Sequence, residues 1–169
     1  MIQANLDATP SRAPGLIRMP GPVVNKLLEW GAPLGPNVLV TIRGRKSGEP
    51  RTQPLAIFSD GGRRWLIGTF GDTNWCRNLR ANPDIDIRHG RHHEQLHARE
   101  LSREEAELFF SHDLPMGISH LPLYLRVFSR FFLRATAPVM KTDPIAAAAT
   151  HPVFELVSPD RPSGTSRTV

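Results

Sequence analysis

Residues 37–67 read NVLVTIRGRKSGEPRTQPLAIFSDGGRRWLI, and this stretch decides the fold. Three of its segments are rich in β-branched and apolar residues and are predicted to be strands: Asn37–Arg43, Arg51–Ser59 and Arg64–Thr69. Turn residues separate them, at Gly44–Pro50 and at the hairpin signal Asp60-Gly61-Gly62. Pro54 places part of the second strand at an edge or bulge, because proline has no N–H for a ladder. Strands joined by short turns indicate an antiparallel sheet.

The segments that follow alternate between helical and strand patterns. Helical spacing and end signals predict helices at Val23–Trp30, Asn74–Asn82, Ser102–His112 and Leu121–Ala135. The third begins with the capping box Ser102-Arg103-Glu104-Glu105. Further strands are predicted at Asp84–His89, His93–Leu101 and Pro152–Val157.

This order of elements indicates an α+β, mainly β fold. Six short strands linked by hairpins tend to close into a barrel, and the absence of regular βαβ alternation argues against a Rossmann sheet. We expect a flexible N-terminal lead at 1–22, a single domain at 23–157 and a disordered tail at 158–169.

Composition favours a soluble, cytoplasmic protein with an anionic partner. The 169 residues carry a net charge of +5, and most of the 21 basic residues are arginine. Arginine binds phosphate and carboxylate in a bidentate manner, so nucleic acid, a phosphorylated cofactor and an anionic membrane all fit this charge. Apolar runs are shorter than the ~20 residues of a membrane span, and Met1–Ala13 lacks the apolar core of a secretory signal. The lone Cys76 excludes an internal disulfide.

The basic turn Arg43–Arg51 is the sharpest candidate for a binding site. It carries Arg45, Lys46 and Arg51 as cations and Ser47 as a further donor, and its glycines allow backbone N–H groups to approach an anion. A Walker A loop is excluded, because glycine is missing immediately before the lysine. The alternative interpretation is a solvated basic hairpin tip.

Other candidate features are weaker. The loop Thr69–Asn74 enters a helix, whose N-terminus attracts anions, although an ordinary capped helix start explains it equally. The histidines of the hairpin around Gly90 do not converge, since His93 and His97 lie roughly 13 Å apart along a strand, so we expect no metal site. No catalytic triad or carboxylate pair is present, which suits an enzyme whose cofactor carries out the chemistry.

Several separated motifs resemble the deazaflavin (F420)-dependent nitroreductase family. They are GRKSGEPR, the DGG hairpin, a strand ending near FGDTNW, NLRANP and the C-terminal HPVFEL, in that order over about residues 20–157. The resemblance implies a split β-barrel, similar to the FMN-binding split barrels, with flanking helices. It also implies reduced coenzyme F420, whose phosphate and polyglutamate tail suit the basic turn.

Carried over by position, the resemblance implies three groups of cofactor-binding residues. Arg45, Lys46, Ser47 and Arg51 would hold the phosphate and tail; Pro54, Leu55, Thr69, Phe70 and Gly71 would border the ring; and Trp75, Asn78 and Arg80 would form a wall on the helix side. Tyr124 and His120 are the candidate proton donors. Phe70 stands where the nitro-drug-activating branch often has lysine, and Tyr124 is the single tyrosine, so nitro reduction is not carried over with the fold.

The predicted function is hydride transfer from F420H2 to an apolar or aromatic substrate, of nitroreductase or ene-reductase type. The alternatives are a non-catalytic deazaflavin, lipid or haem carrier on the same fold, and an FMN-dependent reductase. Nucleic acid is not expected as a partner, because no exposed aromatic stripe accompanies the basic residues. The protein is expected to be a monomer or homodimer.

The helix predicted at Leu121–Ala135 carries its own hypothesis. Apolar residues recur at spacings of three and four, and Arg126, Arg130 and Arg134 recur every four residues. The expectation is a core helix or an apolar lid over the substrate. The alternative is peripheral contact with an anionic membrane surface.

Overall fold

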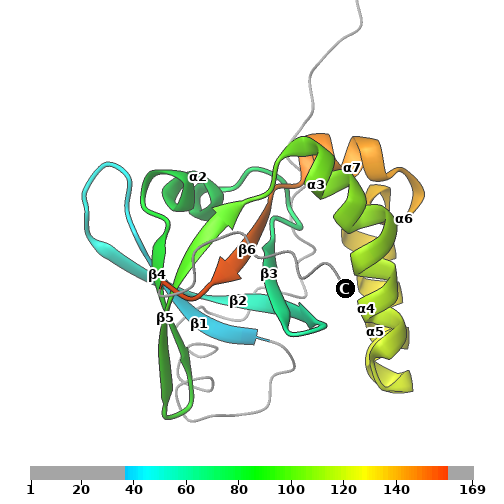
Figure 1. Ribbon diagram of the computed structural model, residues 1–169, viewed down its shortest axis with the longest axis horizontal. Coiled ribbons are helices and arrows are strands. Elements are labelled where there is room, and N and C mark those ends of the chain that lie inside the picture. Colours follow the sequence, from blue (N-terminus) through cyan, green and yellow to red (C-terminus); the bar gives the residue numbers. More distant parts are fainter. Residues whose placement is uncertain (1–36, 160–169) are drawn as a thin grey trace, which may run out of the picture.

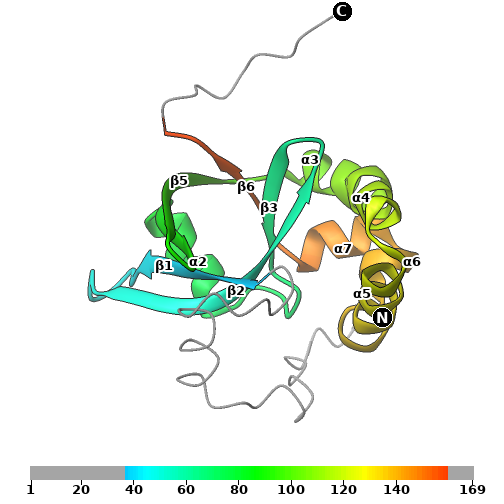
Figure 2. The same ribbon diagram turned by 90° about the horizontal axis from the view of Figure 1, so that it is seen from below.

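The predicted strands form a closed antiparallel barrel. A computed structural model describes residues 37–159, in which six strands close a barrel in the order β1-β2-β3-β6-β5-β4 (Figure 2). They are β1 (Asn37–Arg43), β2 (Pro50–Asp60), β3 (Arg63–Ile67), β4 (Asp84–His89), β5 (His92–Glu100) and β6 (Val153–Val157). The structure confirms the predicted fold class, a mainly β split barrel with flanking helices. The helix predicted at Val23–Trp30, the lead at 1–22 and all but two residues of the predicted tail lie outside the described residues.

The alternation of apolar and polar residues along a strand determines which side chains fill the barrel. In β4, Ile85 and Ile87 are buried while Asp84 and Asp86 are exposed, as a period of two requires. Helix α2 (Asn74–Ala81) adds Cys76 and Leu79, both fully buried, to the same apolar core. The helix therefore packs against the barrel and is held there by burial of apolar surface.

A helical layer covers the other side of the barrel (Figure 1). It consists of α3 (Arg103–Leu108), the π-helical turn η2 (Phe109–Asp113), α4 (Leu114–His120), α5 (Leu123–Thr136), α6 (Val139–Thr142) and α7 (Pro144–Thr150). An aromatic cluster joins this layer to the barrel: the Phe109 ring lies 5.3 Å from that of Trp65 and meets that of Phe58 edge-on at 5.8 Å, centroid to centroid. No helix of the described residues is long and apolar enough to span a membrane.

The helical layer is more extensive than the sequence pattern predicts. Ser102 and Glu105 form the predicted capping box at α3, but the helical path continues through η2 and α4 as far as His120. Pro115 lies in the first turn of α4, directly after the π-helical turn η2. Gly117 lets α4 approach β2 closely, since a Cβ there would collide with the ring of Phe58.

The Glu155 carboxylate on β6 links side chains of β3 and β5 and predicts an acid-sensitive fold. It accepts hydrogen bonds from Arg63 Nε at 2.8 Å and Arg99 Nη2 at 2.7 Å. Burial alone would raise the pKa of Glu155, but these two guanidinium groups outweigh it and hold the pKa below its usual value. A lowered folded pKa stabilises the protein above the unfolded value of about 4.3. That contribution disappears as the pH falls through the folded pKa.

The variant Glu155→Gln is therefore expected to lower the free energy of unfolding by about 1–2 kcal/mol at neutral pH. The difference from the wild-type protein should shrink as the pH falls below the unfolded value of about 4.3, and it should vanish once the pH is below the folded pKa and the wild-type carboxylate is protonated. Urea denaturation at both pH values measures this. A loss of unfolding free energy that is the same at both pH values would contradict the lowered pKa of Glu155.

The β1–β2 hairpin extends beyond the barrel and carries the basic turn. Strand β2 pairs with β3 only from Ile57 to Asp60, whereas its pairing with β1 continues to Pro50. Pro54 therefore lies in a part of β2 that pairs on one side, which confirms the predicted edge position. The turn at the end of this hairpin lies beside α2 (Figure 1).

Candidate cofactor-binding site

The turn between β1 and β2 depends on two glycines. The Gly44 N–H donates to the Glu49 carbonyl at 2.9 Å, and the Gly48 N–H donates to the Gly44 carbonyl at 2.8 Å. Gly48 has a φ of +70°, a left-handed conformation that favours glycine. A Cβ on Gly44 would lie 2.9 Å from Ser47 Oγ and 3.2 Å from Arg51 Nε. The first glycine of GRKSG thus lets the serine and arginine side chains fold over the turn.

Arg45 fastens this turn to α2. Asn78 Oδ1 accepts hydrogen bonds from the Arg45 backbone N–H at 3.2 Å and from Arg45 Nη1 at 2.9 Å. Asn74 Oδ1 accepts a third from Arg45 Nη2 at 3.3 Å. Asn78 is 8% exposed, so its amide is a buried polar group held by these bonds. Asn78 therefore acts as a positioning residue that places the basic turn against the helix.

A groove of about 360 Å³ lies between the turn and α2. Its lining residues come from β1, the turn, β2 and α2: Ile42, Gly44, Arg45, Lys46, Ser47, Arg51, Gln53, Asn74, Trp75 and Asn78. Arg51 and Gln53 share a strand face with Leu55, which packs against the barrel core. Buried Ile42 and half-buried Trp75, whose ring lies 5.8 Å from that of Phe154, add apolar surface to the groove.

The cations of the groove lack carboxylate partners within residues 37–159. Neither Lys46 nor Arg51 forms an ion pair there, and Arg45 contacts only amide and carbonyl oxygens. Other arginines of the barrel are neutralised: Arg64 forms a bidentate pair with Glu94 at 2.6 and 2.7 Å. Glu49, the carboxylate within the turn, does not line the groove. The groove is therefore a region of uncompensated positive charge with an apolar wall, which suits an anionic ligand that has a flat apolar part.

The ring-bordering residues predicted by the resemblance do not gather in this groove. Pro54 and Leu55 are neighbours on β2, so their side chains point to opposite faces of the strand. Thr69, Phe70 and Gly71 form the turn between β3 and α2, where Gly71 donates its N–H to the Gly68 carbonyl at 2.8 Å. None of these five lines the groove, and their contact with a ring stays a prediction.

Arg80 is engaged in a structural network. Its guanidinium donates to both oxygens of Glu100 at 2.7 Å and to Asp72 Oδ1 at 2.6 Å. The bond to Glu100 is the largest cause of the raised pKa of Arg80. Arg80 therefore links α2 to the end of β5, and it does not line the groove.

The two candidate proton donors lie in the helical layer. Tyr124 is 73% exposed on α5, and His120 Nδ1 lies 2.8 Å from Asp60 Oδ1 at the end of α4. Figure 1 shows α4 and α5 on the opposite side of the barrel from α2. The structure thus separates both residues from the groove, and their role stays a prediction.

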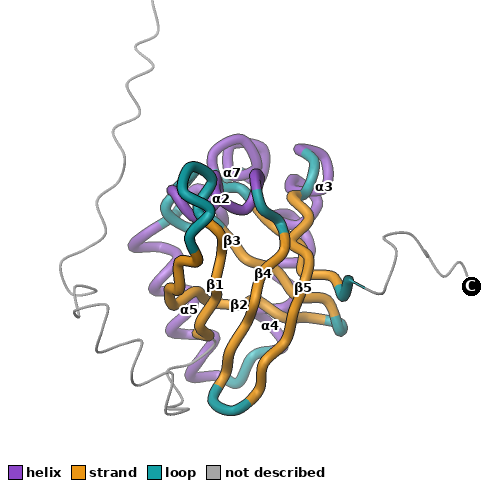
Figure 3. Tube along the Cα trace, turned by 90° about the vertical axis from the view of Figure 1, so that its left-hand side faces the viewer, coloured by secondary structure: helices purple, strands orange, loops and turns teal. Residues whose placement is uncertain are grey.

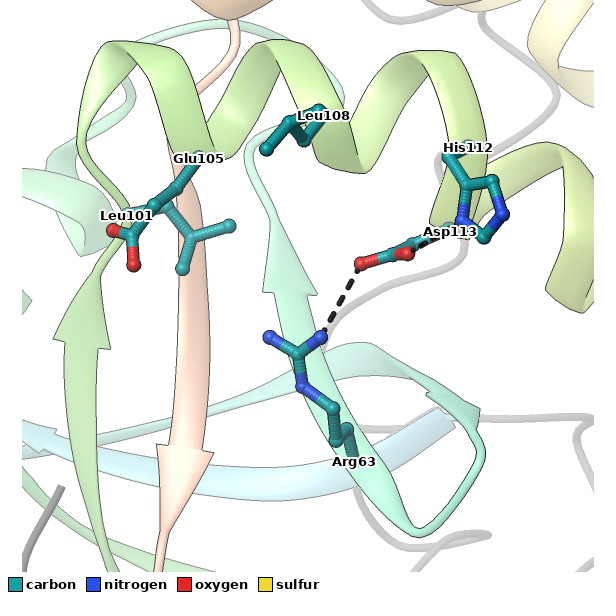
Figure 4. Close-up of a pocket in the computed structure, with 6 residues that line it drawn as sticks. All are labelled: Arg63, Leu101, Glu105, Leu108, His112 and Asp113. Carbon is teal, nitrogen blue, oxygen red and sulfur yellow. Dashed lines mark hydrogen bonds and ion pairs between the residues drawn. The ribbon is translucent and has the colours of Figure 1, made fainter. Parts of the chain in front are cut away.

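A second hollow of about 280 Å³ lies between β3 and the helical layer (Figure 4). Arg63 reaches into it, but its guanidinium is bound by Asp113 at 3.4 Å and by Glu155 at 2.8 Å. His112 Nδ1 also lies 3.1 Å from Asp113 Oδ1. Since Arg63 is already paired with carboxylates, this hollow offers an anion much less than the groove beside α2.

Metal and thiol chemistry receive no support from the described part of the chain. No group of three or more histidine, cysteine or acidic side chains there could hold a metal ion. The strands of the histidine-containing hairpin lie side by side in Figure 3, and His97 Nδ1 is paired with Asp84 at 2.8 Å. Burial raises the pKa of the Cys76 thiol and so keeps it protonated.

Ile42, Gln53 and Asn74 line the groove although the sequence did not single them out as cofactor-binding residues. Alternation along β2 carries the signal for Gln53, which lies two residues after Arg51. Asn74 lies at the start of α2, where the loop enters the helix. Ile42 is fully buried, and its pattern is that of an ordinary core residue.

A cationic groove with an apolar wall, formed by a turn and a helix beside a six-stranded barrel, is a site that suits an anionic cofactor. Comparison with known families makes this specific: residues 20–118 match the F420H(2)-dependent quinone reductase family, and the chain belongs to it. Membership confirms the predicted recognition of an F420-dependent family and its cofactor, reduced F420. The family is described by quinone reduction, and the nitroreductase subtype stays a prediction.

Individual relatives cover only part of the chain. An F420H(2)-dependent quinone reductase of Mycobacterium tuberculosis is 36% identical over 64 residues, which are 36% of this chain and 42% of that protein. A solved F420-H2 dependent reductase, FDR-A, is 24% identical and covers 72% of this chain and 93% of its own, with a TM-score of 0.44. A chain described as a domain-swapped dimer is 22% identical and covers 80% of this chain and 94% of its own, with a TM-score of 0.47.

Proposed function

We propose that this protein catalyses the two-electron reduction of an apolar, quinone-type acceptor by F420H2, and that the groove beside α2 binds the coenzyme. The observation that carries the proposal is the groove itself. It places Arg45, Lys46 and Arg51 together without a carboxylate partner in the described residues, next to the apolar surface of Ile42 and Trp75. A coenzyme with an anionic tail and a flat ring matches both halves of this arrangement.

The donor set fits the tail of F420. Lys46 and Arg51 would hold the phosphate and glutamate oxygens, and Ser47 would add a hydroxyl donor. Hydrogen bonds to charged groups contribute roughly 1.5–3 kcal/mol each. Arg45 contributes charge while its position is kept by Asn74 and Asn78. The turn is therefore already assembled for an anion, so little ordering would accompany binding.

Ile42, Trp75 and Gln53 would hold the ring end. The first two supply apolar surface that excludes water, and the Gln53 amide supplies a donor and an acceptor. When bound, reduced F420 supplies a hydride equivalent for the acceptor. The protein's contribution is to orient the two reactants and to keep the reacting centre dry. An apolar acceptor is favoured because such an acceptor gains from leaving water.

No protein nucleophile takes part in this mechanism, and Cys76 is the test case. Its Sγ is buried and lies 3.4 Å from Thr73 Oγ1 and 3.7 Å from the Gly71 carbonyl oxygen. The variant Cys76→Ser is therefore expected to keep nearly the wild-type kcat, because a serine hydroxyl can use the same partners. Steady-state kinetics measure this, with circular dichroism to verify folding. A folded variant without activity would show that the thiol is required.

The proposed function is tested by mixing the purified protein with F420H2 under anaerobic conditions and adding acceptors. We expect F420H2 to be oxidised when a short-chain naphthoquinone is added, and to be oxidised more slowly when a small charged acceptor is added. The change in deazaflavin absorbance measures the oxidation. Binding of F420H2 without oxidation by any quinone would favour a carrier instead. Tight binding of FMN with none of F420 would favour a flavin reductase.

A further inference from the structure

Helix α5 exposes an unusual amount of apolar surface. Leu123, Tyr124, Val127 and Phe131 are 66%, 73%, 58% and 73% exposed, respectively. At about 100° per residue these four side chains, together with Arg130 and Arg134, lie within an arc of about 120° on one side of the helix. Isolated exposed hydrophobic residues are normal on a soluble protein, but a contiguous apolar group marks a surface that binds something.

This exposed face is separate from the face that anchors the helix. Leu133 is 8% exposed and belongs to the core between the barrel and the helical layer. Figure 2 shows α5 at the outer side of that layer, away from α2. The fold therefore accounts for the Leu133 side of α5, and within residues 37–159 the face around Val127 has no structural role.

The charge along this segment of the chain has one sign. The sequence from Leu114 to Thr142 contains no aspartate or glutamate, whereas it contains Arg126, Arg130, Arg134 and Lys141. Arg130 and Arg134 are exposed and follow Val127 and Phe131 by three residues, so they share the apolar face. A helix with apolar and basic side chains on its outer surface suits the boundary between the headgroups and acyl chains of an anionic membrane.

A second copy of the chain fits this face poorly. A two-fold interface would bring the same surface against itself, so Arg130 and Arg134 would meet arginines rather than carboxylates. Like charges brought together in this way oppose association. Lipid phosphates, in contrast, would complement the arginines while the acyl region accepts Leu123, Val127 and Phe131.

We propose that the exposed face of α5 docks the protein onto anionic lipid membranes, with the helix lying in the plane of the surface. Tyr124 would lie at the headgroup level, where its ring and hydroxyl suit the two environments. The interaction combines burial of apolar side chains with electrostatic attraction, so it should weaken as salt rises. This docking surface is independent of the coenzyme groove, and its test does not depend on catalytic activity.

The experiment is co-sedimentation of the full chain with phosphatidylcholine vesicles, with and without phosphatidylglycerol. We expect binding to the anionic vesicles at low salt, and at least about tenfold weaker binding at high salt or without phosphatidylglycerol. The double variants Val127→Ser/Phe131→Ser and Arg130→Gln/Arg134→Gln should each weaken binding by about tenfold or more. Thermal unfolding of each variant verifies that it folds.

Two matched controls separate the α5 face from general properties of the chain. Leu108→Ser/Ile145→Ser removes two side chains that are 66% and 58% exposed on other helices. Arg91→Gln/Arg103→Gln removes the same charge as the arginine variant. Both control pairs should bind vesicles as the wild-type protein does.

The proposal is overturned if the wild-type chain does not bind anionic vesicles at low salt, or if the controls lose as much binding as the α5 variants. It is also overturned if Val127→Ser/Phe131→Ser abolishes self-association while vesicle binding is unchanged.

Discussion

Replacing Lys46 and Arg51 together by alanine is expected to weaken F420H2 binding by about a hundredfold or more, and Lys46→Ala alone by about tenfold or more. Each side chain presents a cation to the groove without a carboxylate partner in the described residues. A charge-assisted hydrogen bond contributes roughly 1.5–3 kcal/mol, and about 1.4 kcal/mol corresponds to tenfold in affinity. Fluorescence titration with the coenzyme measures the loss.

A matched control distinguishes a local effect from a change in net charge. Lys141→Ala/Arg91→Ala also removes one lysine and one arginine, from exposed positions outside the groove. This control should bind F420H2 within about twofold of the wild-type protein at moderate salt, because distant surface charges are screened. Unchanged affinity in both Lys46→Ala and Arg51→Ala would remove the basic turn from the binding site.

The largest expected effect on stability comes from Phe109→Ala, which should lower the free energy of unfolding by about 3–5 kcal/mol. Phe109 is 1% exposed and contacts the rings of Trp65 and Phe110, each at a centroid distance of 5.3 Å. Truncation would leave a cavity where the helical layer meets the barrel, and these neighbours are too constrained to fill it. Denaturant unfolding followed by tryptophan fluorescence measures the loss.

Phe131→Ala serves as the control for the same chemical change. Phe131 is 73% exposed, so its truncation should alter the free energy of unfolding by less than about 0.5 kcal/mol. Equal losses in the two variants would mean that the cluster around Phe109 does not hold the helical layer on the barrel.

The barrel was predictable because its signals are local. Alternation in Asp84–His89 determines which side chains face inward, and the turn residues between β1, β2 and β3 determine that these strands pair in order. The continuation of α3 into α4 was not predictable from the sequence pattern. Pro115 and Gly117 read as helix breakers, and only contact with Phe58 of a distant strand shows why glycine is needed there.

The candidate binding site likewise has a part that the sequence predicts and a part that only the structure shows. Clustering of Arg45, Lys46, Ser47 and Arg51 follows from a tight turn, so the sequence predicts it. The family resemblance implied Asn78 as part of a wall on the helix side, and the structure shows two hydrogen bonds that join it to the basic turn. The structural role of Arg80 depends on Glu100, twenty positions along the chain. No local pattern contains that pairing.

The central claim is that the cations beside α2 recognise the anionic tail of F420. The most direct measurement compares the affinity for complete F420 with the affinity for its deazaflavin chromophore lacking the phosphate and glutamates, in the wild-type protein and in Lys46→Ala/Arg51→Ala. We predict that the wild-type protein prefers complete F420 by about a hundredfold or more, and that the double variant binds the two ligands with similar affinity. Equal binding of both ligands by the wild-type protein, or a preference that survives in the double variant, would contradict the account.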